Sequence, residues 1–566
     1  MIIRQLSVKS FRGINNLDWT LPDQPIICFV GPGDSTKSTI LDAIEWVLSP
    51  RWNLSIFDSD FYNMNIEEPI VIMATIGGLP ESYLSLDKFG SYVRGWVKGK
   101  LIDEPVEDCE EVITIQLLID QTLEPVWTLF TERDEKKRIT SARERESIGM
   151  QRLGFYTERH LSWGYGSALS RLTDDLENIP RVLAEVNRNA RNSLDQSKLN
   201  KLQEVAEKAQ KLGIEYGINQ KDEYYPAIDP TNINENVSSI TLFEGNIPTK
   251  QSGLGSKRLL ALALQQNCVK EGSIQLIDEI EYGLEPHRIR HLLHTLSNNH
   301  SKDKNDGQLF ITTHSKEVIE ELHAYEINIV RSVNGTTTIK QVDNGFQGTI
   351  RAESAALLGK KIIVCEGKTE LGICRIMDKR WAEEPNGKPF AHLGVVAVDG
   401  NGSTAPKYAL HLQELGYEVC YFADGDRNDY TPSNSTLEKN GVKVICWDNN
   451  YCTEQRIFHD IPWSGVQLAI NLAISRKGKE SVHAIISSNI EFGGPISLEN
   501  INDWLVQEVS EEQIRIGLGV AAKEGRWFKQ IESGEQLGNL VYECLLNMQA
   551  TNTDKNLREL KVWAYA

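Results

Sequence analysis

Several features are missing from this 566-residue sequence, and each absence excludes a class of protein. The chain contains no apolar run of about eighteen residues, so it predicts no membrane-spanning helix. The first residues, MIIRQLSVKSFRG, have the pattern of a strand and not of a signal peptide, which favours a cytoplasmic location. The nine cysteines include no CxxC pair, which favours reduced, buried thiols over disulfides or zinc.

Positive charge is also scarce. The chain has 60 Lys and Arg against 79 Asp and Glu, which gives a formal net charge of −19. This balance argues against DNA binding over the whole surface. It does not exclude DNA binding at a local basic groove, because a metal-dependent nuclease recruits phosphate through its ions. No tyrosine stands in a recognisable nucleophile context, which argues against a topoisomerase.

Two apolar runs in the second half end in paired carboxylates. IIVCEGKTE carries Glu366 and Glu370, and VCYFADGDRND carries Asp424 and Asp426. Open α/β sheets place their chemistry at the carboxyl ends of their strands, and Mg²⁺ prefers carboxylate oxygens. Ordinary strand-end acids would explain either motif alone. The two in this order predict a divalent-metal site.

Three other features are further candidates for this site. Glu454 follows the apolar run VKVIC, so its carboxylate would complete a metal cluster at the same sheet edge. Lys529 precedes a predicted Gly-Glu turn and a helix, where it would neutralise charge on a pentacovalent phosphate; an exposed, solubilising lysine is the alternative. The glycine-rich segment 399–403 fits either a phosphate or metal site or an ordinary strand-to-helix turn.

The first half contains the strand–loop–helix pattern of a P-loop. The apolar run IICFV leads into GPGDSTKST and then into a helical pattern. Loop amides would cradle phosphates, Lys37 would reach the β- and γ-phosphates, and Ser38 would ligate Mg²⁺. The other loop residues predicted to bind nucleotide are Gly31, Gly33 and Thr39. Thr36 replaces the last glycine of the motif, and since threonine rarely takes a positive φ, we expect an altered loop. Whether ATP is hydrolysed stays open.

Three later segments resemble the remaining motifs of ABC-type ATPases. SIQLIDEIEYGLEP presents Asp278 and Glu279, which by this resemblance would order Mg²⁺ and activate the attacking water. QLFITTHS contains His314, at the position of the switch histidine that senses the γ-phosphate. QSGLGSKR resembles the looser G-x-G-x-x-R form of the signature segment. Its candidate participants are Ser252, Gly253, Gly255 and Arg258.

The order of these motifs resembles the SMC/RecF-like ABC ATPase heads, and the Phe11-Arg12-Gly13 turn is also typical of that group. In such heads the signature of one copy caps the nucleotide of another. The resemblance therefore implies a homodimer or a higher homo-oligomer. Residues 168–215 have helical periodicity and predict a hairpin, which either mediates dimerisation or packs on its own head.

We therefore predict an α/β protein in which an ABC-type P-loop ATPase with a helical insertion precedes a Toprim domain. The motif pair E-G-x-x-E and D-x-D carries the resemblance to Toprim. The predicted parts are 1–167, the P-loop and β-lobe; 168–220, the helical insertion; 221–350, the signature, Walker B and His-switch part; and 351–566, the Toprim domain with a C-terminal helical region.

This combination resembles the OLD (overcoming lysogenization defect) family, whose members are DNA nucleases. The resemblance implies ATP and Mg²⁺ (or Mn²⁺) as cofactors and DNA as substrate. Two ions would be held by Glu366, Glu370, Asp424, Asp426 and Glu454. Glu366 and Lys529 would serve cleavage, and Glu279 and His314 would serve ATP hydrolysis.

Several relatives of that family act in bacterial defence against phage, among them the Gabija nuclease and effectors encoded beside retrons. The resemblance thus implies an ATP-regulated endonuclease or nickase, with a reverse transcriptase and its DNA, or a helicase, as possible partners. A RecF-like repair nuclease is the first alternative. A nucleotide-gated DNA-binding scaffold is the second, and the intact Toprim motifs argue against it. The DNA target, trigger and oligomer count stay open.

Overall fold

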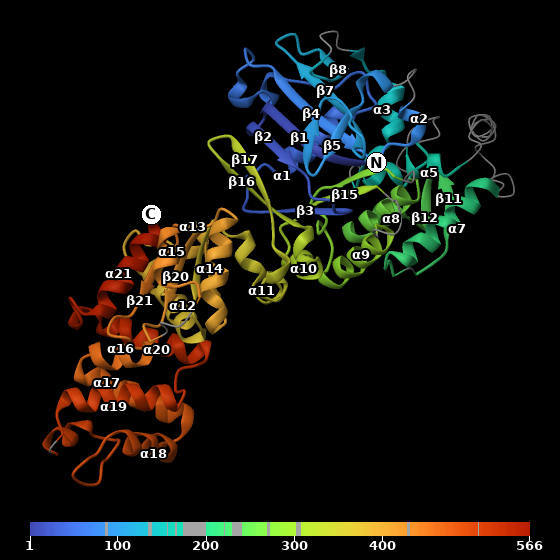
Figure 1. Ribbon diagram of the computed structural model, residues 1–566. Coiled ribbons are helices and arrows are strands. Elements are labelled where there is room, and N and C mark those ends of the chain that lie inside the picture. The colour runs from blue at the N-terminus through green and yellow to red at the C-terminus, as the bar shows by residue number, and fades with distance from the viewer. Residues whose placement is uncertain are drawn as a thin grey trace. The chain divides into compact units, whose positions relative to one another are not determined.

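The computed structural model describes residues 1–84, 89–133, 138–154, 157–164, 167–173, 200–219, 221–228, 240–268, 272–300, 307–426, 431–507 and 509–566. The chain forms two compact units, Met1–Gly345 and Phe346–Ala566. Both combine helices with sheets, as the predicted α/β class requires (Figure 1). No helix in the described part of the chain is both long enough and apolar enough to cross a bilayer.

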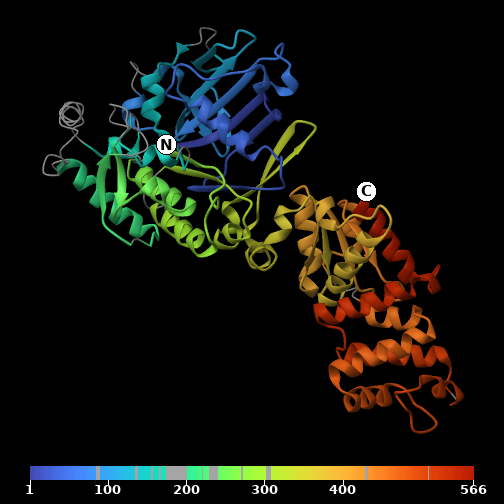
Figure 2. The same cartoon turned by 180° about the vertical axis from the view of Figure 1, so that it is seen from behind.

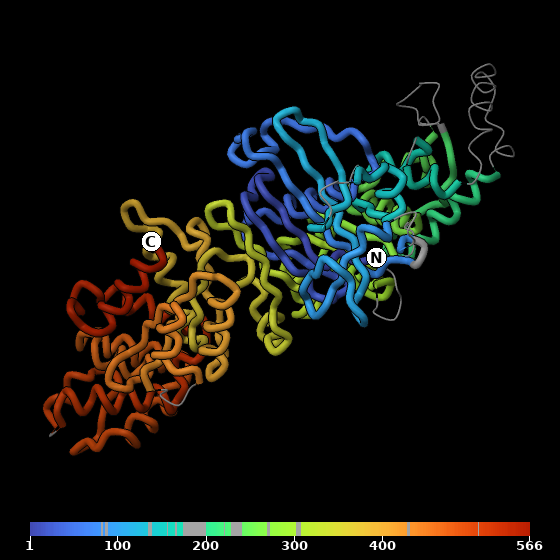
Figure 3. The backbone as a smooth tube through the Cα atoms, turned by 45° about the horizontal axis from the view of Figure 1, so that its top comes forward, coloured from blue at the N-terminus to red at the C-terminus, as the bar shows by residue number. Residues whose placement is uncertain are grey.

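The first unit contains a sheet with 14 strands within the described residues. Its parallel part runs in the order β10-β14-β15-β3-β16, and its antiparallel part includes β1, β2, β4 and β7. All five residues of β3 are buried, as expected for a strand covered on both faces of a parallel sheet. Strands from both ends of the unit therefore lie side by side, with β3 between β15 and β16. In Figure 3 the blue and the yellow-green parts of the tube accordingly run next to each other.

The strands of this unit are β1 (Ile2–Phe11), β2 (Ile14–Thr20), β3 (Ile26–Val30), β4 (Ile70–Gly77), β5 (Arg94–Val97), β6 (Lys100–Ile102), β7 (Glu110–Ile119), β8 (Pro125–Leu129), β9 (Arg138–Ile139), β10 (Met150–Leu153), β11 (Tyr224–Ile228), β12 (Ile240–Glu244), β13 (Ile247–Pro248), β14 (Ile274–Ile277), β15 (Gln308–Thr312), β16 (Ile327–Val333) and β17 (Thr336–Gln341). Its helices are α1 (Lys37–Val47), α2 (Glu81–Leu84), α3 (Ala142–Ile148), α4 (Thr157–His160), α5 (Ala168–Arg171), α7 (Asn200–Glu215), α8 (Leu254–Asn267), α9 (Pro286–Asn299) and α10 (Lys316–Glu321).

The predicted helical hairpin is described only in part. Residues 174–199, which include most of its first predicted helix, lie outside the described residues. The second predicted helix corresponds to α7, whose apolar face is buried against α8 and β11 of the same unit. The buried residues of that face are Leu202, Val205, Ala206, Ala209 and Leu212.

The second unit is built on a four-stranded parallel sheet with the order β19-β18-β20-β21. Helices α17, α18 and α19 stack beyond one end of this sheet (Figures 1 and 2). The elements are α11 (Gln347–Ala352), β18 (Lys361–Cys365), α12 (Lys368–Glu383), α13 (Phe390–Leu393), β19 (Val395–Asp399), α14 (Ala405–Glu414), β20 (Glu418–Ala423), α15 (Asn434–Lys439), β21 (Lys443–Cys446), α16 (Thr453–Asp460), α17 (Trp463–Lys477), α18 (Lys479–Asn489), α19 (Glu511–Glu524), α20 (Ile531–Cys544) and α21 (Asn552–Tyr565).

Candidate functional site

The P-loop connects β3 to α1 and encloses the side chain of Lys37. Its ammonium donates to the carbonyl oxygens of Gly31 (3.1 Å) and Pro32 (2.8 Å) and to Ser35 Oγ (3.1 Å). Burial lowers the pKa of Lys37 to about 8, although the nearby charge of Asp278 acts in the opposite direction. The amine is therefore held inside the loop at the position from which a P-loop lysine meets phosphate.

Thr36 corrects one sequence-based expectation. We expected the threonine to alter the loop, but Thr36 takes the left-handed conformation (φ 67°) that a glycine would adopt there, directly before α1. Its hydroxyl lies 3.1 Å from that of Thr337, which helps to hold the strained residue. A β-branched residue at such a φ costs roughly 1–3 kcal/mol. The loop therefore carries backbone strain at the residue directly before α1.

Asp278 lies at the carboxyl end of β14 and joins three elements. Its Oδ1 accepts from Ser38 Oγ (3.0 Å) and Thr312 Oγ1 (2.5 Å), and its Oδ2 accepts from the guanidinium of Arg152 (2.9 Å). The predicted Mg²⁺ ligands Ser38 and Asp278 are thus in direct contact, although 240 residues separate them. Sequence reasoning missed Arg152, because nothing in the short strand β10 marks its partner.

The residue that holds the predicted switch segment is Glu281, which sequence reasoning also missed. Its carboxylate accepts from the main-chain N–H of His314 (2.5 Å) and from Thr313 Oγ1 (2.8 Å). The signal was present as the second glutamate of the DEIE run. Glu279 is exposed with a left-handed backbone (φ 45°), and its N–H donates to Thr312 Oγ1 (2.8 Å). Burial, together with the charge of Lys37, lowers the pKa of His314, so its ring is neutral near pH 7.

The signature segment opens α8, and Gly253 is its N-cap residue. A Cβ on Gly255 would lie 2.5 Å from the carbonyl oxygen of Gly283, so only glycine fits this contact. Arg258 points inward: its guanidinium donates to the carbonyl oxygens of Asp278 (2.7 Å) and Glu279 (2.6 Å). Arg258 therefore fixes the loop that follows β14 in its own chain.

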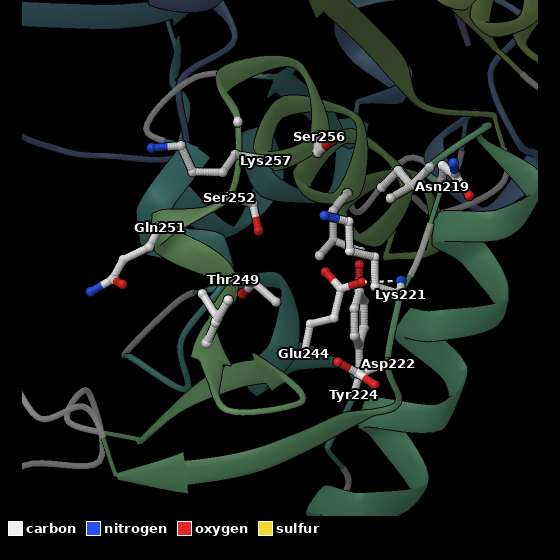
Figure 4. A pocket seen from close by; sticks show the side chains of 14 residues that line it. Asn219, Lys221, Asp222, Tyr224, Glu244, Thr249, Gln251, Ser252, Ser256 and Lys257 are labelled. Carbon is white, nitrogen blue, oxygen red and sulfur yellow. Dashed lines mark hydrogen bonds between the residues drawn. The ribbon is translucent and has the colours of Figure 1, made fainter.

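A pocket of about 320 Å³ lies beside this segment. Figure 4 shows Ser252 and Thr249 on one side of it and Lys221 opposite. Gly253 and Ser256 also line it, so the predicted nucleotide-capping residues Ser252 and Gly253 face a cavity.

In the second unit, four carboxylates meet at the carboxyl edge of the sheet. Glu366 directly follows β18 and Asp424 directly follows β20, and the N–H of Asp424 donates to Glu366 Oε2 (3.0 Å). Thr453, the first residue of α16, donates its N–H (2.7 Å) to Asp424 Oδ1. Its hydroxyl lies 2.8 Å from the same oxygen and 2.5 Å from Glu370 Oε1. Glu454 is the next residue along this helix. Thr453 thus joins two carboxylates that come from different motifs.

Burial dominates the electrostatics of this cluster. Burial and then the charge of Asp424 raise the pKa of Glu370 to about 8, and burial raises the pKa of Glu454. Lys529 Nζ lies 3.2 Å from Glu454 Oε1. Burial alone would lower the pKa of Lys529, but the charges of Glu454 and Asp424 outweigh it and raise that pKa. Buried carboxylates that crowd each other disfavour ionisation, and a bound cation would relieve this.

The donor set suits hard divalent cations. Among the residues that the structure describes, no three His, Cys, Asp or Glu side chains already stand at the spacing of a coordinated ion. The carboxylate oxygens of the cluster instead accept hydrogen bonds from protein donors. Thr453 donates to Asp424, and Lys523 donates to Asp426 (2.5 Å). Within the described residues, Glu454 Oε2 is buried without a hydrogen-bond partner and is therefore available to a metal ion. The residues fit such ions, because carboxylate oxygens are the ligands that Mg²⁺ uses.

Two details of the sequence interpretation change. The predicted turn after Lys529 is wrong, because Gly534 and Glu535 lie inside α20. A Cβ on Gly534 would come within 2.7 Å of the carbonyl oxygen of Thr369, so this glycine serves helix packing. In the segment 399–403, Asp399 Oδ1 accepts from Asn401 N–H (2.9 Å), which favours the turn interpretation over a metal ligand.

Comparisons with known protein families give one match within each of the two compact units. A family model described as "AAA domain, putative AbiEii toxin, Type IV TA system" matches residues 26–320. A second, described as "Overcoming lysogenization defect protein-like, TOPRIM domain", matches residues 357–426. No curated protein matches the chain.

Matching solved structures include heads of SMC proteins. The SMC head domain from Thermotoga maritima is 16% identical, with a TM-score of 0.30 over 61% of this chain and 100% of that one. The Smc head domain bound to the C-terminal domain of ScpA, derived from Pyrococcus furiosus, is 15% identical, with a TM-score of 0.37 over 62% of this chain and 99% of that one. An SmcHead bound to the C-winged helix domain of ScpA is 13% identical, with a TM-score of 0.37 over 61% of this chain and 98% of that one.

Proposed function

Because the chain belongs to the AAA-domain ATPase family of the first model and carries an OLD-like Toprim domain near its C-terminus, we propose that it is an ATP-regulated, divalent-metal-dependent DNA endonuclease or nickase. The observation that carries this proposal is the contact of the Asp424 N–H with Glu366 (3.0 Å), with Thr453 joining Asp424 to Glu370. Strand ends that are distant in sequence thus bring oxygen ligands together.

Cleavage would take place at this carboxylate cluster. Two divalent ions, Mg²⁺ or Mn²⁺, would be held by Glu366, Glu370, Asp424, Asp426 and Glu454. When bound, such a pair supplies an activated water and stabilises the leaving 3′-oxygen. Lys529 holds Glu454 in place, and its ammonium would lie beside the charge that develops on the phosphate. Without a bound ion, the raised pKa of Glu370 (about 8) favours its protonated form and so reduces its repulsion from Asp424; a bound ion would displace that proton.

ATP would act through the first unit. Lys37 and the amides around Gly31 and Gly33 would bind its phosphates, with Thr39 at the start of the helix. Ser38 and Asp278 would share the nucleotide's Mg²⁺, because they already share a hydrogen bond (3.0 Å). Glu279 would activate the water and His314 would sense the γ-phosphate. Ser252 and Gly253, which face the pocket beside α8, and Gly255 would cap a nucleotide bound to a second copy, so we propose a homodimer or higher oligomer.

We propose a role in bacterial defence against phage, in the cytoplasm. The description of the first family model names a toxin of a toxin–antitoxin system, which favours a defence role over a RecF-like repair nuclease. A reverse transcriptase with its DNA, or a helicase, would be the partner in a multi-component system. A scaffold that binds DNA without cutting it remains the alternative of a different class.

Plasmid cleavage tests the proposal. Purified chain is incubated with supercoiled plasmid and Mg²⁺ or Mn²⁺, with and without ATP, beside the variants Glu366→Ala and Lys37→Ala. We expect metal-dependent nicking that Glu366→Ala abolishes and that no longer responds to ATP in Lys37→Ala. Cleavage that survives Glu366→Ala would remove the Toprim site from the account.

A further inference from the structure

The last turn of α19 and its connection to α20 carry three cations, two of which contact carboxylates of the cluster. Lys523, in the last turn of α19, donates to Asp426 Oδ2 (2.5 Å). Lys529, just before α20, lies 3.2 Å from Glu454 Oε1. Arg526 lies between them. One short segment therefore already binds two of the proposed metal ligands, from opposite ends.

This connection is firmly anchored. Trp527 and Phe528 are both about one per cent exposed, and Trp527 packs on Phe458 of α16 with 6.2 Å between the ring centroids. The main-chain carbonyl of Phe528 accepts from Thr369 Oγ1 (2.9 Å), and the N–H of Gly525 donates to the carbonyl of Ala521 (2.8 Å). The backbone from which Arg526 projects is therefore held in place.

Arg526 is strained and exposed. Its φ is 48°, in the left-handed region that glycine or asparagine adopts far more readily than arginine. Its N–H donates to the carbonyl of Lys523 (3.2 Å), and no side-chain partner is found among the described residues. An arginine at a backbone position that favours glycine is a candidate for a functional role of its charge.

We propose that Arg526 and Lys523 bind backbone phosphates of DNA next to the one that is cleaved. This inference rests on the proposed nuclease function. A divalent ion on Asp426 would repel the ammonium of Lys523, which could then pair with a phosphate of the substrate. Because the chain carries a net charge of −19, its hold on DNA depends on such local cations.

DNA binding under varied salt tests this inference. Binding of a short fluorescein-labelled DNA duplex is measured by anisotropy in the full chain, in a Glu366→Gln background that keeps an acceptor for the Asp424 N–H. Arg526→Gln, Arg526→Gly and Lys523→Gln are compared with Lys479→Gln. Lys479 is a matched control, because it is exposed on α18 and paired with Glu499 (2.8 Å).

We expect each test variant to bind about three- to tenfold more weakly and to lower the slope of log Kd against log salt by about one, as for a lost phosphate contact. The control should match the parent. Arg526→Gly separates the two roles of the residue: it should melt at a higher temperature than Arg526→Gln, because it relieves the left-handed strain, yet bind DNA as weakly.

Two results would overturn the inference. If Arg526→Gly melts higher and both Arg526 variants bind like the control, the arginine does not contact DNA. If the wild type cuts plasmid but the test variants bind DNA like the control, the inference fails while the proposed function stands. If the wild type cuts nothing but these variants lose salt-dependent binding, the phosphate contact stands and cleavage fails.

Discussion

Thr36 shows how a single residue stores strain at the nucleotide loop. It holds a left-handed backbone, with its hydroxyl 3.1 Å from that of Thr337. Thr36→Gly removes the steric cost, whereas Thr36→Ala keeps that cost and loses the hydroxyl contact. We expect Thr36→Gly to exceed Thr36→Ala in free energy of unfolding by about 1 kcal/mol, measured by urea denaturation. The reverse order would mean that the loop changes its path when the threonine is replaced.

His160 gives the ATPase unit a pH-dependent stability. Ala168 donates its N–H to His160 Nδ1 (3.1 Å), and burial, helped by Arg159 and Arg171, lowers the pKa of the ring from 6.5 to about 4. Between these values the folded chain binds fewer protons than the unfolded chain. This contribution is therefore complete above about pH 6.5 and is lost as the pH falls towards 4.

We expect acidification to lower the stability of the wild type by up to about 3 kcal/mol through this residue. His160→Asn, whose side-chain oxygen can replace Nδ1 as an acceptor, should remove this part of the loss. The thermal midpoints of both chains at pH 7 and pH 5 provide the measurement. Equal drops in both chains would show that the ring is not buried in its neutral form.

Residue-level contacts also mark the limit of what the sequence reveals. Glu366 and Asp424 could be predicted as strand-end acids, because each follows a run of apolar residues. Arg152 on Asp278 and Lys523 on Asp426 could not, because each pairs with a partner about a hundred residues away. Such pairs depend on how elements pack and leave no local pattern.

Elements were predictable where periodicity was clear. Short apolar runs predicted the parallel strands, and a periodic pattern predicted the helix after the P-loop. The structure confirms the strands and the helix. In α8, residues 259–264 are all buried, so this helix has no polar face along that stretch. It was found through its motif and not through its amphipathicity.

At the element scale, glycines bring α12 and α20 together and so position Glu370 near Lys529. A Cβ on Gly372 would lie 2.4 Å from the carbonyl oxygen of Ile531, and one on Gly538 would lie 2.4 Å from Ile376 Cγ2. We expect Gly372→Ala to lower the free energy of unfolding by about 1–3 kcal/mol through overpacking. The thermal midpoint of the full chain measures this.

Gly493→Ala is the matched control for that substitution, because a Cβ there has nothing within 4 Å. It should leave the midpoint unchanged. A Gly372→Ala chain that melts with the control would show that the two helices lie further apart than the structure places them.

At the scale of the whole molecule, the ATPase motifs and the Toprim carboxylates lie in separate compact units. Ser38 meets Asp278 in the first unit, and Glu366 meets Asp424 in the second. The OLD-like ATPase–Toprim combination that the motifs indicated is confirmed by the two family matches. The predicted domain bounds and the site roles stay predictions, because motif spacing alone does not test them.

The most direct test of the account is Mn²⁺ binding to the full chain without nucleotide, followed by electron paramagnetic resonance. The wild type and Lys37→Ala should bind Mn²⁺ alike, because the carboxylate cluster lies outside the P-loop unit. Asp424→Asn should lose that binding, since it removes a carboxylate from the centre of the cluster. Equal Mn²⁺ binding by Asp424→Asn and the wild type would contradict the account.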